Sequence, residues 1–269
     1  MIRSDFHMHT SYADGKCSVC EMAEAAIAGG FDTIGFSEHA YVPFDPDYSM
    51  SPVASEKYRH EVLCAGKKYG GKIKILCGAE MDFDSEDDPA LYEYIIGSVH
   101  YIKVGGKVYS VDATPEETLK CVREGFGGDF DGYAEAYFEK VARICEKTGA
   151  NIIGHFDLIT KFERFGASPK LESGRALHAW QSALRALAGK AALEINTGAM
   201  SCSYRDMPYP SKAILNEWKK LGGAVVITSD AHFAPNIGYA FDAAEALART
   251  CGFDTAGFTS KNGVFYRQF

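Results

Sequence analysis

Short apolar runs alternate along this chain with amphipathic stretches of helical period. Seven runs have the length and apolar content of buried strands, and most are separated from the next by a stretch of helical period. The strand-like runs are 5–9 (DFHMH), 32–39 (DTIGFSEH), 72–80 (KIKILCGAE), 94–102 (YIIGSVHYI), 150–155 (ANIIGH), 191–198 (AALEINTG) and 223–232 (GAVVITSDAH). This alternation predicts an α/β fold with a mostly parallel sheet.

The helical stretches have recognisable beginnings and ends. Ser18 and Glu21 form the pattern of a capping box, which predicts a helix that ends at Gly29 or Gly30. Further helices are expected over about 53–69, 115–124, 131–148, 172–188, 211–221 and 239–251, and a short strand pair follows the last of them. No repeat, low-complexity tract or linker interrupts the pattern, so residues 1–269 are expected to form a single domain.

Metal-capable side chains recur at the carboxyl ends of these runs. Six of the seven runs end in His, Asp or Glu. In an open sheet, ligands gather at one crevice supplied by two or three strands, whereas a closed barrel brings all strand ends around one centre. The pattern therefore predicts a (β/α)7 barrel with its active site at the carboxyl ends of the strands. The residues concerned are His7, His9, His39, Glu80, His100, His155, Asp230 and His232.

A metal cluster is the chemistry that this set favours. His7 and His9 are two residues apart on a strand, so their side chains face the same side. Neutral imidazoles bind zinc, iron or manganese, and a carboxylate such as Glu80 can bridge two ions. A single histidine at a strand end is more often a hydrogen-bonded core residue, but six at equivalent positions are not independent accidents. With Asp14, nine candidate ligands exceed the demand of one ion and suit two or three divalent ions.

Composition and charge narrow the choice of partner. The chain has 269 residues, of which 46% are hydrophobic, enough for a full core. Its net charge of −8 argues against long nucleic acids, whose phosphates bind to basic surfaces. The sequence shows no apolar segment of a signal peptide and no run that predicts a membrane span. Eight scattered cysteines indicate reduced thiols and a cytoplasmic location, while the oligomeric state stays open.

Several ordered motifs resemble those of one enzyme superfamily. HMHTSYADG, SEH, GAE, SVH, GHFD and SDAH occur in the order found in the PHP (polymerase and histidinol phosphatase) superfamily. Within it, GSVHYI, GGDFDGYAEAYFEKV, IIGHFDLITKF and LEINTG are similar to segments of the monofunctional histidinol-phosphate phosphatases. The resemblance implies a distorted (β/α)7 barrel that holds three metal ions. It also implies hydrolysis of L-histidinol phosphate, a small phosphate monoester, in histidine biosynthesis.

The resemblance further implies how the ligands divide among the ions. Each of three sets of ligands holds one ion. Glu80 belongs to both the first and the second set and bridges their two ions, whereas the third set shares no residue with the others. The three sets are His7, His9, Glu80 and Asp230; Glu80, His100 and His155; and Asp14, His39 and His232.

The expected chemistry follows from such a site. Metal ions neutralise phosphate oxygens and lower the pKa of bound water from about 15.7 toward about 7. We expect in-line attack by a metal-bridging hydroxide, with Asp230 either orienting and deprotonating that water or acting only as a ligand. Arg205 and Lys161 are the candidate phosphate contacts, because their cationic groups suit phosphate oxygens. Arg164 is a further candidate, and Cys202 stands where another basic residue is expected.

Other polar residues are assigned no catalytic role. His60 and His178 fall on expected helices away from strand ends, which favours structural or surface roles. Asp45 and Asp47 could meet a substrate ammonium, although a solvated turn is favoured. Two alternatives to the phosphatase stay open: a PHP-type nucleotide phosphoesterase or nuclease, and a catalytically inactive metal-bound scaffold. The complete ligand set argues against the scaffold, because an inactive relative is expected to lose such charge-crowded positions.

Overall fold

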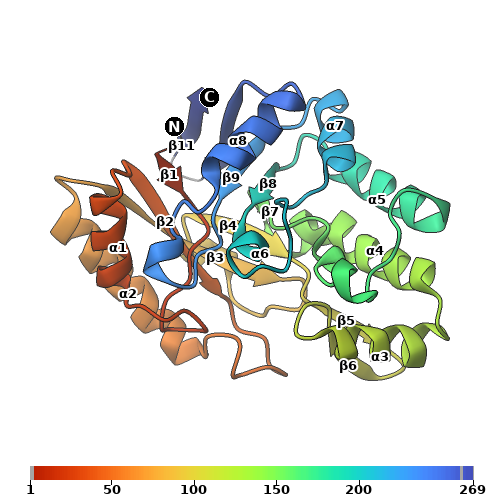
Figure 1. Cartoon of the computed structure of the whole chain (residues 1–269). Helices are drawn as coiled ribbons and strands as arrows, with labels where there is room; N and C mark the ends of the chain where they lie inside the picture. Colours follow the sequence, from red (N-terminus) through yellow and green to blue (C-terminus); the bar gives the residue numbers. More distant parts are fainter. Residues whose placement is uncertain (1–2, 261–262, 269) are drawn as a thin grey trace.

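Seven parallel strands form the centre of the molecule. The computed structural model describes residues 3–260 and 263–268. Within this part of the chain, the sheet has the order β1-β2-β3-β4-β7-β8-β9, and every neighbouring pair is parallel. Its strands are β1 (Ser4–Asp5), β2 (Thr33–His39), β3 (Lys74–Asp82), β4 (Tyr94–Ser98), β7 (Ile152–Ile153), β8 (Ala192–Asn196) and β9 (Val225–Thr228). Helices surround this sheet (Figure 1).

All of the expected helices are present, with similar bounds. The helices are α1 (Val19–Ala28), α2 (Pro52–Tyr69), α3 (Pro115–Phe126), α4 (Phe130–Thr148), α5 (Gly174–Leu187), α6 (Gly198–Ser201), α7 (Lys212–Lys220) and α8 (Phe241–Thr250). Short 3-10 turns lie in the loops: η1 (Pro89–Leu91), η2 (Leu158–Thr160), η3 (Glu163–Phe165) and η4 (Ala234–Asn236). The capping box of α1 is formed, because Ser18 and Glu21 each accept the other's backbone N–H. None of the described helices combines the length and apolar character needed to span a membrane.

The chain segments just beyond the two edge strands meet, so the sheet is nearly closed into a barrel. Just beyond β1 and β9, Met8 and Ala231 form a parallel bridge. The His9 N–H donates to the Ala231 carbonyl at 2.9 Å, and the Ala231 N–H donates to the His7 carbonyl at 3.2 Å. This closure at the carboxyl end of the sheet confirms the predicted (β/α)7 barrel. It is made by the same segments that carry candidate ligands.

One expected strand is in fact two, and this changes the surroundings of His100. The apolar run 94–102 leaves the barrel after Ser98, and its second half is β5 (Tyr101–Val104). That strand pairs antiparallel with β6 (Lys107–Ser110) in a separate hairpin, whose Gly105-Gly106 turn has positive φ at both residues. His100 lies in the connection, where its N–H donates to Asp82 at 2.7 Å. The expectation of one strand was wrong because an apolar run does not show where a chain leaves its sheet.

The tail of the chain forms the expected strand pair. β10 (Thr255–Ser260) and β11 (Gly263–Gln268) pair antiparallel. Phe258 on β10 packs edge-on against Phe6 with ring centroids 4.9 Å apart, and it also contacts Tyr94 at 5.5 Å. The tail therefore contributes to the apolar interior beneath the strand ends.

Tyr94 fills the interior of the barrel beneath the candidate site. Its side chain is fully buried, and its hydroxyl donates to the carbonyls of Phe6 at 2.6 Å and Phe36 at 3.0 Å. The ring lies over Gly35 on β2 and Gly78 on β3, where an added Cβ would overlap it. Glycine is required at these two positions because the ring occupies the space of a side chain.

Gly78 gives a test of this packing. We expect Gly78→Ala to lower the free energy of unfolding by about 1–3 kcal/mol, because the added methyl group overlaps a ring that two hydrogen bonds hold in place. The matched control is Gly66→Ala on α2, where an added Cβ meets no atom within 4 Å. There we expect equal or higher stability, since alanine favours a helix over glycine by about 0.5–1 kcal/mol. Urea unfolding measures both variants, and equal stability of the two would contradict this packing.

Candidate metal centre

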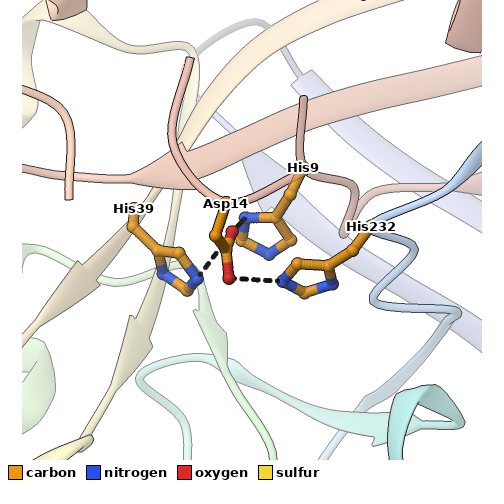
Figure 2. A group of neighbouring side chains, drawn as sticks. All are labelled: His9, Asp14, His39 and His232. Atoms are coloured by element: carbon orange, nitrogen blue, oxygen red, sulfur yellow. Dashed lines mark ion pairs between the residues drawn. The ribbon is translucent and has the colours of Figure 1, made fainter. Parts of the chain in front are cut away.

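Three imidazoles surround the carboxylate of Asp14 at one side of the barrel mouth (Figure 2). Asp14 Oδ2 lies 3.2 Å from His232 Nε2, and Asp14 Oδ1 lies 3.6 Å from His39 Nε2 and 4.0 Å from His9 Nδ1. The His9 ring stacks against each of the other two rings, with centroid distances of 4.2 Å to His39 and 4.1 Å to His232. The end of β2 and the segments that follow β1 and β9 therefore converge on one point.

Glu80, the carboxylate on β3, lies at the centre of four imidazoles, of which His39 also faces Asp14. Its Oε2 is 2.9 Å from His39 Nδ1 and 3.2 Å from His7 Nε2. Its Oε1 is 2.9 Å from His155 Nε2 and 3.4 Å from His100 Nε2. All five side chains are buried. One carboxylate thus faces histidines from four different strand ends, as expected of a bridging ligand.

Asp230 completes the group from the segment after β9. Its Oδ1 lies 3.2 Å from His9 Nε2 and 3.5 Å from His7 Nε2, while its Oδ2 accepts a hydrogen bond from Asn196 at 3.0 Å. The backbone of Asp230 has a φ of +52°, a conformation that non-glycine residues rarely adopt. Gly198 leaves room for it, since a Cβ there would lie 2.8 Å from the Asp230 Cβ. Strained backbone conformations of this kind cluster at active sites and ligand-binding sites, where the surrounding structure holds them in place.

The nine predicted ligands are brought together, and their donor atoms fit a metal cluster. The cluster contains three groups of residues, and within each group the possible ligand atoms lie within 4.8 Å of one another. His155 is not a member of these groups, but its Nε2 lies 2.9 Å from Glu80 Oε1 in the third. Several buried donor atoms have no hydrogen-bond partner among the described residues, a rare state that a bound cation would relieve. The three groups are His9, Asp14, His39 and His232; His7, His9 and Asp230; and His39, Glu80 and His100. The unpartnered atoms that face the cluster are Nε2 of His7, both ring nitrogens of His9 and Oε2 of Glu80.

The electrostatics of the group keep His9 neutral and the carboxylates ionised. Burial, together with the charges of His232 and His39, lowers the pKa of His9 to about 3. Burial opposes ionisation of Glu80 and Asp230, but the neighbouring imidazoles hold the pKa of both carboxyls well below their usual range. Burial opposes protonation of His7, His100 and His232, but neighbouring carboxylates raise the pKa of these three imidazoles, so a metal ion would displace a proton from each of them. Neutral imidazoles and ionised carboxylates are the forms that coordinate metals.

Comparison with known proteins decides the family. The family model described as "PHP domain" matches residues 5–198 of this chain. The chain belongs to the PHP domain family. The resemblance of the ordered motifs is thereby confirmed.

Two curated relatives match this PHP protein along nearly its whole length. The histidinol-phosphatase of Bacillus subtilis is 29% identical over 266 residues, which cover 90% of this chain and 98% of the relative. The probable histidinol-phosphatase of Deinococcus radiodurans is 26% identical and covers 94% of this chain and 95% of its own.

Two solved structures share the fold of this PHP protein. The putative histidinol phosphatase of Listeria monocytogenes has a TM-score of 0.77 at 23% identity, covering 89% of this chain and 98% of that one. The histidinol phosphate phosphatase of Lactococcus lactis has a TM-score of 0.73 at 25% identity, covering 98% of both chains. That enzyme was solved in complex with zinc, L-histidinol and phosphate.

A cavity of about 220 Å³ opens above the cluster of this PHP protein. Its lining includes seven of the nine candidate ligands, all except His7 and His9. Lys161, on the segment after η2, also lines it and pairs with Asp112 at 3.1 Å. Cys202 lines the same cavity, where a further basic residue was expected. Of the predicted phosphate contacts, Lys161 is therefore the one that the structure places beside the cluster.

Arg205 lies outside this cavity. It lines a neighbouring cavity of about 680 Å³, and its guanidinium donates to the Thr160 hydroxyl and to the Met207 carbonyl at 3.3 Å. It also lies over the Tyr209 ring, 4.4 Å from the centroid, while the Tyr209 side chain lines the cavity above the cluster. In this arrangement Arg205 supports the wall of the site from behind. Arg164 is exposed and pairs with Asp206.

The two histidines that were assigned no catalytic role lie away from the cluster. His60 and His178 are exposed on α2 and α5. They offer matched controls for substitutions of the buried histidines.

Glu194 on β8 is a buried carboxylate beside the cluster that the sequence reasoning missed. Its Oε1 lies 2.5 Å from His7 Nδ1 and accepts the Thr228 hydroxyl at 2.6 Å. Its Oε2 accepts the His155 N–H at 2.7 Å and the Asn196 side-chain amide at 3.0 Å. A carboxylate on Nδ1 fixes the imidazole tautomer and leaves Nε2 to face the cluster.

A signal for Glu194 was present in the sequence. The run AALEINTG was the one strand-like run without a candidate ligand at its end, yet it carries an acid two residues before its last strand position, Asn196. Side chains two apart on a strand face the same side. An acid inside an otherwise apolar strand, facing the barrel interior, indicates a partner for a buried histidine.

Substitution of Glu194 tests this positioning role. We expect Glu194→Gln to weaken the binding of a divalent transition metal by about 10- to 100-fold, because the His7 ring loses the acceptor that orients it. Competition with a chromophoric chelator measures the affinity. Glu116→Gln on the exposed face of α3 is the control and should bind metal as the unchanged protein does. Unaltered affinity in Glu194→Gln would show that Glu194 serves the fold alone.

Proposed function

We propose that this PHP protein is a divalent-metal-dependent phosphatase that hydrolyses L-histidinol phosphate to L-histidinol and phosphate. The observation that carries the proposal is a cluster of nine histidine and carboxylate side chains under a cavity of about 220 Å³. Relatives of matching length are histidinol-phosphatases, and one related structure holds zinc, L-histidinol and phosphate together. The residues that hold zinc in such a fold belong to the same chemical types as those found here.

The cluster is proposed to hold two or three divalent ions, zinc, iron or manganese. His7, His9, Glu80 and Asp230 would hold one; Glu80, shared between the two sets, would hold another with His100 and His155; and Asp14, His39 and His232 would hold a third. Bound there, the ions would neutralise phosphate oxygens and lower the pKa of water to near neutrality. A binding set of imidazoles and carboxylates accepts all three metals.

The protein's own side chains would orient the substrate next to the metal ions. Lys161 lies in the cavity wall and would contact an outer phosphate oxygen. Asp230 is held on one oxygen by Asn196, so its other oxygen stays aimed at the cluster. We propose that this fixed carboxylate both ligates and orients the attacking water. Arg205 would act through Tyr209, whose ring it covers.

Small substrates suit this site better than nucleic acids. Pockets for drug-sized ligands have volumes of about 300–1,000 Å³, so 220 Å³ suits a smaller molecule. The net charge of −8 also disfavours a polynucleotide. A DNA polymerase/3'-5' exonuclease PolX of Bacillus subtilis is 30% identical over 107 residues, but this match covers 37% of the chain and 18% of that protein. The nuclease alternative is therefore the weaker one.

Pathway and location are part of the same proposal. Hydrolysis of L-histidinol phosphate would place the enzyme in histidine biosynthesis. All eight cysteines are free thiols in the structure, which suits a cytoplasmic enzyme.

The substrate proposal is tested with a panel of phosphate esters. The protein, purified without chelator, should carry more than one transition-metal ion per chain and release phosphate fastest from L-histidinol phosphate. AMP, p-nitrophenyl phosphate and single-stranded DNA should react at least about tenfold more slowly, because AMP and DNA are larger than suits a cavity of this size and p-nitrophenyl phosphate lacks the ammonium and the imidazole. Elemental analysis and a phosphate assay give both readouts. Preference for AMP or DNA would support the nuclease alternative, and no turnover with full metal content would support the scaffold.

Histidine variants separate ligands from bystanders. We expect His155→Ala to lower kcat by more than about 100-fold and to reduce metal content, because a metal ion contributes several kcal/mol of transition-state stabilisation. His178→Ala, on the exposed face of α5, should leave both unchanged. Equal losses in the two variants would mean that the buried histidines are structural.

A further inference from the structure

We infer that Asp112 recognises a cationic group of the substrate, and that it does so by exchanging partners with Lys161. The inference rests on the proposed function and adds the residue that selects an aminoalkyl phosphate over other phosphate esters. Asp112 lies in the loop between the β5–β6 hairpin and α3, and its side chain lines the cavity above the cluster.

Asp112 and Lys161 form a pair of opposite charges in the cavity wall. The Lys161 Nζ lies 3.1 Å from Asp112 Oδ2 and donates to the Asp112 carbonyl at 2.9 Å. Both side chains are about four-fifths buried, with 21% of Asp112 and 20% of Lys161 exposed. Burial opposes the ionised form, but Lys161 and His100 hold the pKa of Asp112 below its usual range. The carboxylate is therefore available as an anion at neutral pH.

The position of Asp112 is fixed relative to the cluster. The preceding residue, Val111, donates its N–H to the carbonyl of His100 at 2.9 Å. The hydroxyl of Ser110 donates to Asp112 Oδ1 at 3.2 Å, and the Asp112 N–H donates to that hydroxyl at 3.3 Å. The loop that carries the carboxylate is thus tied directly to a candidate metal ligand. A substrate held at the cluster would meet Asp112 at a defined distance.

The Asp112–Lys161 pair keeps both buried charges compensated, with or without a substrate in the cavity. Phosphate bound at the cluster would attract Lys161, whose removal would leave the Asp112 carboxylate buried and unpaired, a costly state. An ammonium on the same substrate would pair with the Asp112 carboxylate in place of Lys161. Lys161 would then pair with the phosphate, so neither side chain would be left with an uncompensated charge. Among the described residues that line this cavity, Asp112 is the single acid outside the candidate ligand set. L-histidinol phosphate carries an ammonium near its phosphate, whereas AMP and p-nitrophenyl phosphate do not.

The two aspartates first considered for this role are placed elsewhere. Asp45 accepts a hydrogen bond from the Tyr101 hydroxyl at 2.8 Å, and neither it nor Asp47 lines the cavity. Asp47 is exposed in the loop after β2. It therefore supplies a matched control: an Asp→Asn change outside the cavity.

The test compares two substrates that differ only in the ammonium. L-histidinol phosphate and 3-(imidazol-4-yl)propyl phosphate are assayed with the metal-loaded enzyme and with Asp112→Asn. We expect the variant to lose about 10- to 100-fold in kcat/KM on L-histidinol phosphate, the range of a charged hydrogen bond. On the analogue it should lose less than about threefold, so the preference of the enzyme for the ammonium disappears.

Further variants keep the inference falsifiable. Asp47→Asn should preserve the preference, and Lys161→Ala should lower kcat/KM on both substrates by a similar factor, since both carry the phosphate. Asp112→Glu, which keeps the charge, should retain part of the preference even if Asp112→Asn loses metal or folds poorly. Metal content is measured for each variant.

The outcomes distinguish this inference from the proposed function. Equal losses on both substrates in Asp112→Asn would overturn the inference and show that Asp112 only positions Lys161. An ammonium preference that survives in Asp112→Asn would also overturn it and leave the proposed function intact. Failure of the unaltered, metal-loaded enzyme to hydrolyse L-histidinol phosphate would overturn the proposed function and the inference with it.

Discussion

Buried charge at the mouth of the barrel is the constraint on which the rest of this structure depends. An ionised carboxylate costs several kcal/mol to bury unless partners surround it. Glu80 is fully buried and has imidazole nitrogens of four histidines within 3.4 Å. Those histidines come from four strand ends, so the compensation exists only when the barrel has assembled. The fold and the site therefore require each other.

A second set of buried polar groups holds the ligands in place. Asp5 accepts hydrogen bonds from the backbone of Ser229 at 3.1 Å, of Gly238 at 3.3 Å and of His7 at 3.4 Å, and burial raises the pKa of this carboxyl to about 6. Glu194 likewise holds the His7 ring in place through the contact between its Oε1 and His7 Nδ1. Asp5 and Glu194 are occupied by backbone N–H groups and by the His7 ring nitrogen, so neither carboxylate is directed at the metal-binding atoms of the cluster. The cluster keeps its geometry because its neighbours are already satisfied.

Much of this arrangement could be predicted from residue order. Parallel strands bring their carboxyl ends to one edge, so His39 and Glu80 could be placed together without any knowledge of tertiary contacts. The strand exit after Ser98 could not, because apolar periodicity continues unbroken into the hairpin. The position of Arg205 could not either, since a long side chain in a loop chooses its partner by contacts that sequence spacing does not encode. Strand ends are predictable from topology, whereas loop side chains depend on packing.

The closure of the barrel has a consequence for the order of events in folding. Asp5 and Ser229 are 224 positions apart in the sequence and yet share a hydrogen bond. Joining such remote segments costs loop-closure entropy and makes folding slow. During synthesis, the first histidines emerge long before the segment that carries Asp230 and His232, and until that segment docks they have only part of their final surroundings. Ions that bind the closed form alone would stabilise it by mass action. Metal supply and synthesis of the segment after β9 would then act as joint conditions for the last step of folding, with bound ions linking that segment to the one after β1.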